Sequence, residues 1–96
     1  MVVARNYRFS RAEVDLIVRD GDTLVFVEVK TRRNARVDGA AQVGYRKQRH
    51  VMDAAGRYLD DHDYRGDIRF DIVAVTLPLK GGRRLRWVRD AFGFFN

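Results

Sequence analysis

Cysteine is absent from this 96-residue sequence, and proline occurs only once, at Pro78. Without cysteine the chain has neither disulfides nor a thiolate metal site. It also lacks an apolar run of the roughly 18 residues that a membrane-spanning helix needs, and no leader of basic and then apolar residues opens it. A hydrophobic content of 46% excludes a disordered tail. We therefore expect one small soluble, cytoplasmic domain spanning residues 1–96.

Glutamate and lysine are also scarce, although charged residues in general are not. Nineteen lysines and arginines stand against thirteen acidic residues, which gives a net charge of +6. Such a basic chain suits a polyanionic partner, and we expect nucleic acid, most simply DNA. Only three of the basic residues are lysines, and only two of the acidic ones, Glu13 and Glu28, are glutamates. A surplus of arginine over lysine can reflect genomic base composition, so the positions of the scarce residues are more informative.

Hydrophobic periodicity predicts the element order β-β-β-α-β-β. Strands are predicted at residues 2–9, 13–19, 23–31, 68–77 and 84–88, and a helix at 45–61. A strand, a helix and a second buried strand should form a crossover that makes the two strands parallel. The turn signal Asp20-Gly21 makes the preceding pair of strands an antiparallel hairpin. The chain should therefore fold as an α/β domain with a mixed sheet and a flanking helix.

The hairpin should bring four charged side chains together. If paired positions sum to 43, Asp15 lies opposite Glu28 and Glu13 opposite Lys30, and a sum of 41 puts Glu13 opposite Glu28. Both registers place all four side chains on one face. Facing carboxylates destabilise a sheet unless a cation neutralises them, and Mg²⁺ prefers such oxygen ligands. A cation site is favoured over the alternative, a cross-strand salt bridge from Glu13 to Lys30.

The segments around these residues resemble the core of the bacterial YraN family (uncharacterised protein family 0102). This family is related to the PD-(D/E)xK nucleases, which have a restriction-endonuclease-like fold. The matching segments are AEVDLI at 12–17, FVEVKTR at 26–32, KQR at 47–49, RFDIVAV at 69–75 and DAF at 90–92. Family members usually begin with a helix before the first strand, whereas this sequence starts almost at the strand. We therefore expect either that the true start lies upstream or that a homodimer or a protein partner covers that face of the sheet.

The resemblance assigns roles to the residues of the hairpin. Asp15, Glu28 and the backbone carbonyl of Val29 would bind the metal, Mg²⁺ or Mn²⁺. Lys30 would be the catalytic lysine, which orients water or offsets developing charge. Glu13 would be an additional carboxylate that acts as a second ligand or as a base.

Further candidates lie in the predicted helix and the segment before it. Gln48 falls within the apolar arc of the helix, where a polar side chain needs a partner. The resemblance makes it a supporting catalytic residue, and a hydrogen bond to a loop backbone is the equal alternative. The candidate nucleic-acid contacts are Arg32, Arg33, Arg36 and Lys47, with plain solvation as the alternative.

Two groups of residues are expected to be structural. Asp71, in a predicted buried strand, should pair with an arginine rather than bind metal. The aromatic residues Trp87, Phe92, Phe94 and Phe95 should close the core rather than stack on bases. The expected function is a metal-dependent endonuclease that acts on DNA, including branched DNA, by recognising backbone and shape. The alternatives are a catalytically inactive nucleic-acid-binding module and a protein-interaction domain of the same fold.

Overall fold

The computed structural model describes residues 1–32, 43–77, 82 and 84–93. Within these ranges the elements are β1 (Val2–Phe9), β2 (Ala12–Asp20), β3 (Thr23–Arg32), α1 (Tyr45–Asp61), β4 (Asp67–Thr76) and β5 (Arg84–Phe92). The predicted order is confirmed, and β5 continues four residues beyond its predicted end. No helix in the described part of the chain is long and apolar enough to cross a membrane.

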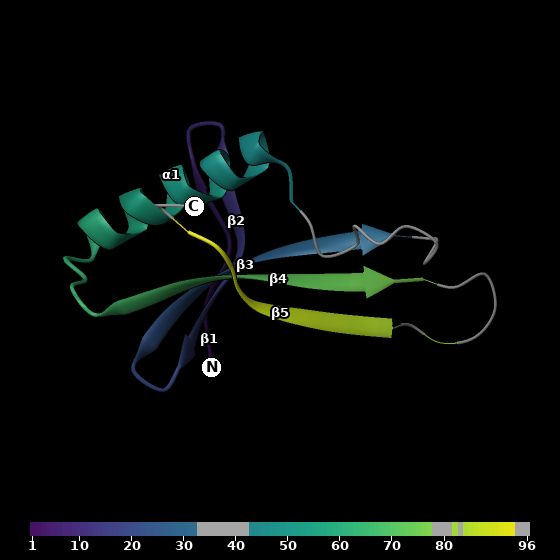
Figure 1. Ribbon diagram of the computed structural model, residues 1–96. Coiled ribbons are helices and arrows are strands. Elements are labelled where there is room, and N and C mark those ends of the chain that lie inside the picture. The colour runs from purple at the N-terminus through teal and green to yellow at the C-terminus, as the bar shows by residue number, and fades with distance from the viewer. Residues whose placement is uncertain (33–42, 78–81, 83, 94–96) are drawn as a thin grey trace.

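The strands form one mixed sheet in the order β1-β2-β3-β4-β5. As predicted, β3 and β4 are parallel, whereas the other neighbouring pairs are antiparallel. Helix α1 connects these two parallel strands and lies across one face of the sheet (Figure 1). The middle of β3 is buried on both faces, with residues 24–27 at most 2% exposed. This double burial explains the continuous apolar run in its sequence.

The main core lies between α1 and the sheet. Phe26 of β3 stacks on Phe70 of β4 with ring centroids 5.6 Å apart, and it meets Tyr58 of α1 edge-on at 6.0 Å. Phe92 closes this core, as predicted, by stacking on Phe70 at 5.2 Å. The helix buries the side that its periodicity predicts, namely Val51, Met52, Ala54, Ala55 and Tyr58.

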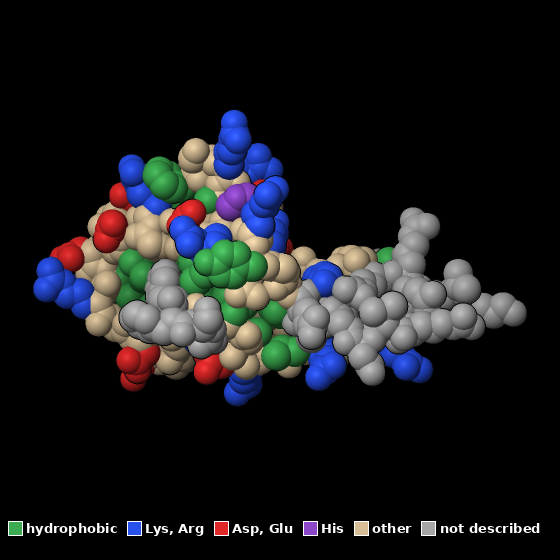
Figure 2. Space-filling model, turned by 45° about the horizontal axis from the view of Figure 1, so that its top comes forward, with side chains coloured by type: hydrophobic (Ala, Val, Ile, Leu, Met, Phe, Trp, Pro, Cys, Tyr) green, Lys and Arg blue, Asp and Glu red, His purple; other side chains and the backbone are tan. Residues whose placement is uncertain are grey.

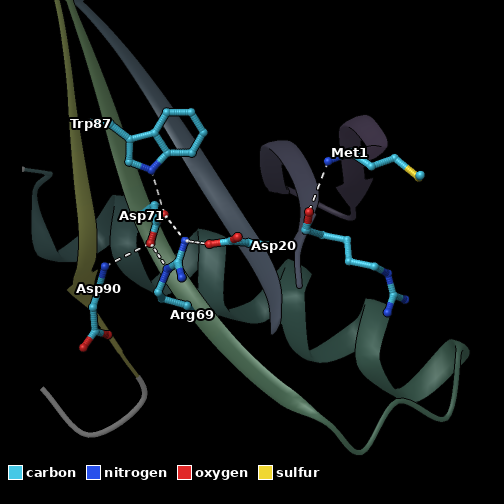
Figure 3. Close-up of polar contacts among 7 residues, drawn as sticks. Met1, Asp20, Arg69, Asp71, Trp87 and Asp90 are labelled. Carbon is cyan, nitrogen blue, oxygen red and sulfur yellow. Dashed lines mark hydrogen bonds and ion pairs between the residues drawn. The ribbon is translucent and has the colours of Figure 1, made fainter. Parts of the chain in front are cut away.

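A buried carboxylate organises the opposite face of the sheet. Asp71 is fully buried and accepts hydrogen bonds from Arg69 Nε at 2.8 Å, Trp87 Nε1 at 2.7 Å and the backbone N–H of Asp90 at 2.9 Å (Figure 3). Arg69 also donates to Asp20 at 3.2 Å. Burial opposes ionisation of Asp71, but these donors outweigh it and lower its pKa. The prediction of a structural carboxylate paired with an arginine is confirmed.

Trp87 does not close the core, contrary to the prediction. Its side chain is 47% exposed and lies on the face opposite α1. The physical reason is strand alternation, since Val88 packs against the helix-side core and its neighbour must point the other way. Trp87 lies opposite Val73, which belongs to a small valine cluster on that second face. Phe94 and Phe95 lie outside the described residues.

In the β1–β2 hairpin, the alternation of side chains between the core and solvent is interrupted at Asn6. Val14 and Ile17 of β2 both belong to the helix-side core although they are three residues apart, so side chains along this strand do not alternate strictly between the two faces. Ala4 and Tyr7 pack against the same core from β1. Asn6, between them, has a φ of 50°. Asparagine adopts this left-handed conformation more readily than most residues, and irregularities of this kind re-aim nearby side chains.

This conformation can be tested by substitution. We expect Asn6→Val to lower the free energy of unfolding by roughly 1–2 kcal/mol relative to Asn6→Gly, because a β-branched residue is strained at positive φ and glycine is not. The exposure of Asn6 keeps changes in burial small. Urea unfolding of the two variants measures the difference. Equal stability of both variants would contradict a left-handed residue at this position.

Candidate active site

The candidate site begins where β2 leaves β3. The described pairing between them runs from Asp20 and Thr23 to Leu16 and Val27, so that paired positions sum to 43, one of the two predicted registers. Before Leu16, β2 continues to pair with β1, but no further pairing with β3 is described. The edge of β3 is therefore open to side chains beyond Val27.

Asp15 occupies the gap between the diverging strands. Its Oδ2 atom accepts a hydrogen bond from the backbone N–H of Val29 at 2.8 Å. The carboxylate thus takes the place of the backbone acceptor that a continued ladder would supply. The N–H and C=O groups of one strand residue point to the same side. The carbonyl of Val29 is therefore directed into the same gap as the Asp15 carboxylate.

Glu28 is a buried carboxyl group beside Asp15. Its side chain is 5% exposed, and its Oε2 atom has no hydrogen-bond partner among the described residues. Burial, together with the hydrogen bond and the negative charge of Asp15, raises the pKa of Glu28 to about 8. Lys47 opposes this rise with its ammonium Nζ 3.8 Å from Oε2. At neutral pH and without another cation, Glu28 therefore carries a proton.

These groups line one cavity of about 390 Å³, together with the residues that lead into α1. Its lining consists of Asp15, Glu28, Val29, Lys30, Val43, Gly44 and Lys47. The structure thus brings together both predicted metal-binding carboxylates, the predicted backbone ligand, the catalytic lysine candidate and one predicted nucleic-acid contact. A larger hollow of about 680 Å³ lies between the β1–β2 turn and α1, and none of the predicted site residues that the structure describes lines it.

The start of α1 is a part of the cavity that sequence reasoning missed. Gly44 is the N-cap and makes no side-chain capping hydrogen bond, and the first turn of the helix contains no acidic residue. The positive end of the helix dipole therefore faces the two carboxylates without local compensation. The lack of an acid in residues 45–48 is a visible signal, because Asp and Glu are favoured at that end of a helix.

Glu13 lies outside this cavity. Its carboxylate is 3.4 Å from Nε of Arg8, the residue opposite it in β1. It affects Glu28 only as a further negative charge that raises the pKa. Because β2 follows β1 in this region, Glu13 is paired with β1, and the predicted opposition to Lys30 is not part of the described β2–β3 ladder.

Gln48 and Arg32 are not among the described residues that line the cavity. Gln48 donates from Nε2 to the backbone carbonyl of Val43 at 2.8 Å, which is the loop-backbone alternative of the sequence analysis. Arg32 is exposed at the end of β3. Arg33 and Arg36 lie outside the described residues.

The donor groups of the cavity suit a divalent cation that keeps part of its water shell. Among the described residues, no group of three or more His, Cys, Asp or Glu is arranged to hold a metal ion. Mg²⁺ needs fewer, because it keeps several waters and is commonly bound by one or two carboxylates plus substrate phosphates. The unpartnered Oε2 of Glu28 fits such an ion, since a buried acceptor without a donor is costly. The fold and site define an α/β domain with a carboxylate pair suited to a hard cation.

Comparison with known proteins assigns the chain to a family. It belongs to the uncharacterised protein family UPF0102, whose family model matches residues 1–75, including Asp15, Glu28 and Lys30. A UPF0102 protein of Nitrosospira multiformis is 45% identical over 93 residues, which cover 96% of this chain and 76% of the relative. Relatives from Methylococcus capsulatus and Frankia casuarinae are 41% and 40% identical, over 94% and 95% of this chain and 73% and 79% of their own lengths. The family part of the predicted resemblance is confirmed.

The raised pKa of Glu28 predicts a distinctive pH dependence. The folded state keeps its proton up to about pH 8, whereas the unfolded carboxyl loses it near 4.5, so the folded state binds more protons between these values. The free energy of unfolding of metal-free protein should therefore fall as pH rises through this window, by up to about 1.4 kcal/mol per pH unit from this group. Glu28→Gln should remove this component and make the protein more stable than wild type at pH 8.

Urea unfolding in EDTA at several pH values between about 5 and 8 measures this effect. Asp60→Asn is the matched control, because it removes an exposed carboxylate from the far end of α1 and should keep the wild-type slope. Parallel pH profiles for wild type and Glu28→Gln would contradict the raised pKa.

Proposed function

We propose that this protein is a metal-dependent endonuclease of restriction-endonuclease-like fold that hydrolyses phosphodiester bonds in DNA. One observation carries the proposal. Two carboxyl groups, Asp15 and Glu28, meet in a cavity with Lys30 and Lys47, and the buried Oε2 of Glu28 has no hydrogen-bond partner among the described residues. Carboxylates adjacent to lysines suit the binding of a cation together with a phosphate.

The arrangement of the elements supports the same class. An antiparallel hairpin carries Asp15 on one strand and Glu28 and Lys30 on the next, followed by a helix and a parallel strand. This is the order that the resemblance to PD-(D/E)xK nucleases implies. Membership of UPF0102 is consistent with this class of protein, because UPF0102 is the family that the sequence resembles.

Asp15, Glu28 and the Val29 carbonyl would hold Mg²⁺ or Mn²⁺ in this proposal. The bound cation would act as a Lewis acid towards the phosphate and lower the pKa of a water ligand. The protein's own residues supply the remaining requirements. Lys30 lines the cavity on the same strand as Glu28 and is placed to orient the attacking water or to offset charge on the phosphate.

The start of α1 would receive the phosphate group. Lys47 has a half-exposed side chain whose ammonium reaches the cavity, and the uncapped backbone N–H groups after Gly44 add positive potential. Phosphate contacts of this kind carry no sequence information. The lysines and arginines form several groups over the visible face rather than one patch, which suits contacts to a branched or bent backbone (Figure 2). Recognition of DNA shape rather than base sequence follows from these features.

A cleavage assay tests the function directly. The full chain is incubated with branched and linear DNA in Mg²⁺, Mn²⁺ or EDTA, and cleavage is expected only with metal. Glu28→Gln and Lys30→Ala should each lower the rate by about 100-fold or more, because the first removes a proposed metal ligand and the second removes a cation that offsets developing charge. Asp60→Asn is the matched control, since it removes an exposed carboxylate from the far end of α1.

A binding measurement separates the metal site from catalysis. Asp15→Asn should weaken Mn²⁺ binding, measured by calorimetry, by about 10-fold or more, whereas Asp60→Asn should not change it. Absence of metal-dependent cleavage, with salt-sensitive DNA binding intact, would replace the nuclease by a catalytically inactive binding module. Weak DNA binding with a defined oligomer would favour a protein-interaction domain.

A further inference from the structure

A second cavity lies on the face of the sheet opposite α1. It has a volume of about 400 Å³, and its lining includes Trp87, Arg19, Arg69 and Arg89. Met1 borders it and exchanges backbone hydrogen bonds with Arg19, of 2.8 Å and 3.1 Å, which fix the end of β1 against β2 (Figure 3). None of the residues that line the candidate active site takes part in this second cavity. We call it the Trp87 cavity.

Trp87 is the only tryptophan of the chain, and nearly half of its side chain is exposed. The ring is nevertheless held in place, because its Nε1–H donates to the buried Asp71 at 2.7 Å. Asp71 is itself fixed by Arg69 and by the backbone of Asp90 (Figure 3). The indole N–H thus has its hydrogen-bond acceptor within the protein. The exposed aromatic surface is therefore oriented before any ligand binds. Such preorganisation lowers the entropic cost of binding.

The charges around the ring are not balanced. Arg69 is committed to Asp71 and Asp20, through contacts of 2.8 Å and 3.2 Å. Arg19 and Arg89 are exposed, and neither forms an ion pair with an acid in the part of the chain that the structure describes.

Arg19 lies opposite Leu24 of the helix-side core, so its side chain points to the other face of the sheet, whereas Arg89 lies on the same face as Trp87. One guanidinium group therefore remains available beside an oriented aromatic ring. An aromatic face with a flanking arginine matches a base joined to a phosphate.

We propose that the Trp87 cavity binds a nucleotide of single-stranded nucleic acid, with its base stacked on Trp87 and an adjoining phosphate at Arg89. Every base has a π-face, so stacking tolerates any sequence, and arginine suits phosphate by its planar set of donors. The inference rests on the proposed function for its nucleic-acid partner. It extends that function by a second contact on the other face of the sheet, which receives the unpaired arm of a branched substrate.

The single tryptophan provides a selective reporter. The oligonucleotide (dT)₄ is titrated into the full chain in EDTA, so that no metal-dependent cleavage can occur, and indole fluorescence is followed. Saturable quenching is expected from a stacked base, and it should weaken as salt is raised. An abasic oligonucleotide with the same phosphates should bind more weakly and leave the fluorescence nearly unchanged. Quenching that is absent, or equal for both oligonucleotides, would overturn the proposal.

A substitution tests the phosphate contact. Arg89→Ala should weaken (dT)₄ binding about 5-fold and reduce the salt slope by about one. Arg49→Ala is the matched control, because it removes an exposed arginine from α1 on the other side of the sheet. Unchanged affinity in Arg89→Ala would overturn the assignment. An indole emission that shifts with protein concentration in the absence of oligonucleotide would assign the cavity to a second copy instead.

Lys30→Ala separates this inference from the nuclease proposal. It should abolish cleavage and leave the quenching by (dT)₄ unchanged, because Lys30 lines the other cavity. Wild-type protein that is quenched by (dT)₄ but never cleaves DNA would support the Trp87 cavity and contradict the nuclease. Cleavage without quenching would support the nuclease and contradict the Trp87 cavity.

Discussion

The hydrogen bond from the backbone of Val29 to the Asp15 carboxylate is the contact on which the candidate site depends. It stands where β2 leaves β3, so it satisfies a donor that would otherwise be exposed by the end of the ladder. The same contact holds Asp15 against Glu28, and the resulting repulsion and burial keep Glu28 protonated. One local break in strand pairing thus creates the gap, supplies its first carboxylate and sets the charge state of the second.

Burial affects two carboxyl groups of the same sheet differently: Asp71 stays ionised, whereas Glu28 is protonated. Asp71 receives hydrogen bonds from two side chains and one backbone N–H, so it remains ionised and ties β4 to β5. Glu28 is left with an unpartnered oxygen and a raised pKa. A satisfied carboxylate stabilises the fold, whereas an unsatisfied one retains the capacity to bind a cation. Such a division is common where stability is sacrificed for function.

The sequence predicted the order and pairing of the strands and the proximity of three charged residues, because these depend on local patterns. Turn chemistry and alternation placed Asp15, Glu28 and Lys30 on a hairpin, and one of the two registers proved correct. The position of Glu13 was predicted wrongly. At its start β2 has separated from β3 and pairs with β1, so Glu13 lies beside Arg8. Trp87 was misplaced because hydrophobicity alone does not say which face of an edge strand is covered. These errors arise from tertiary contacts that no short window of sequence contains.

The hairpin that carries the carboxylates also has a consequence for the folding kinetics. Asp15, Glu28 and Lys30 lie within 16 consecutive residues, and the β2–β3 ladder closes over short chain separations. The parallel pairing of β3 with β4 joins positions that are more than 40 residues apart, such as Thr23 and Asp67. Contacts of low sequence separation form fastest, and long-range parallel pairing is slow. We therefore expect the hairpin with the candidate site residues to form early. The hydrogen bonds of Asp71 can stabilise the sheet only after β3, β4 and β5 have paired.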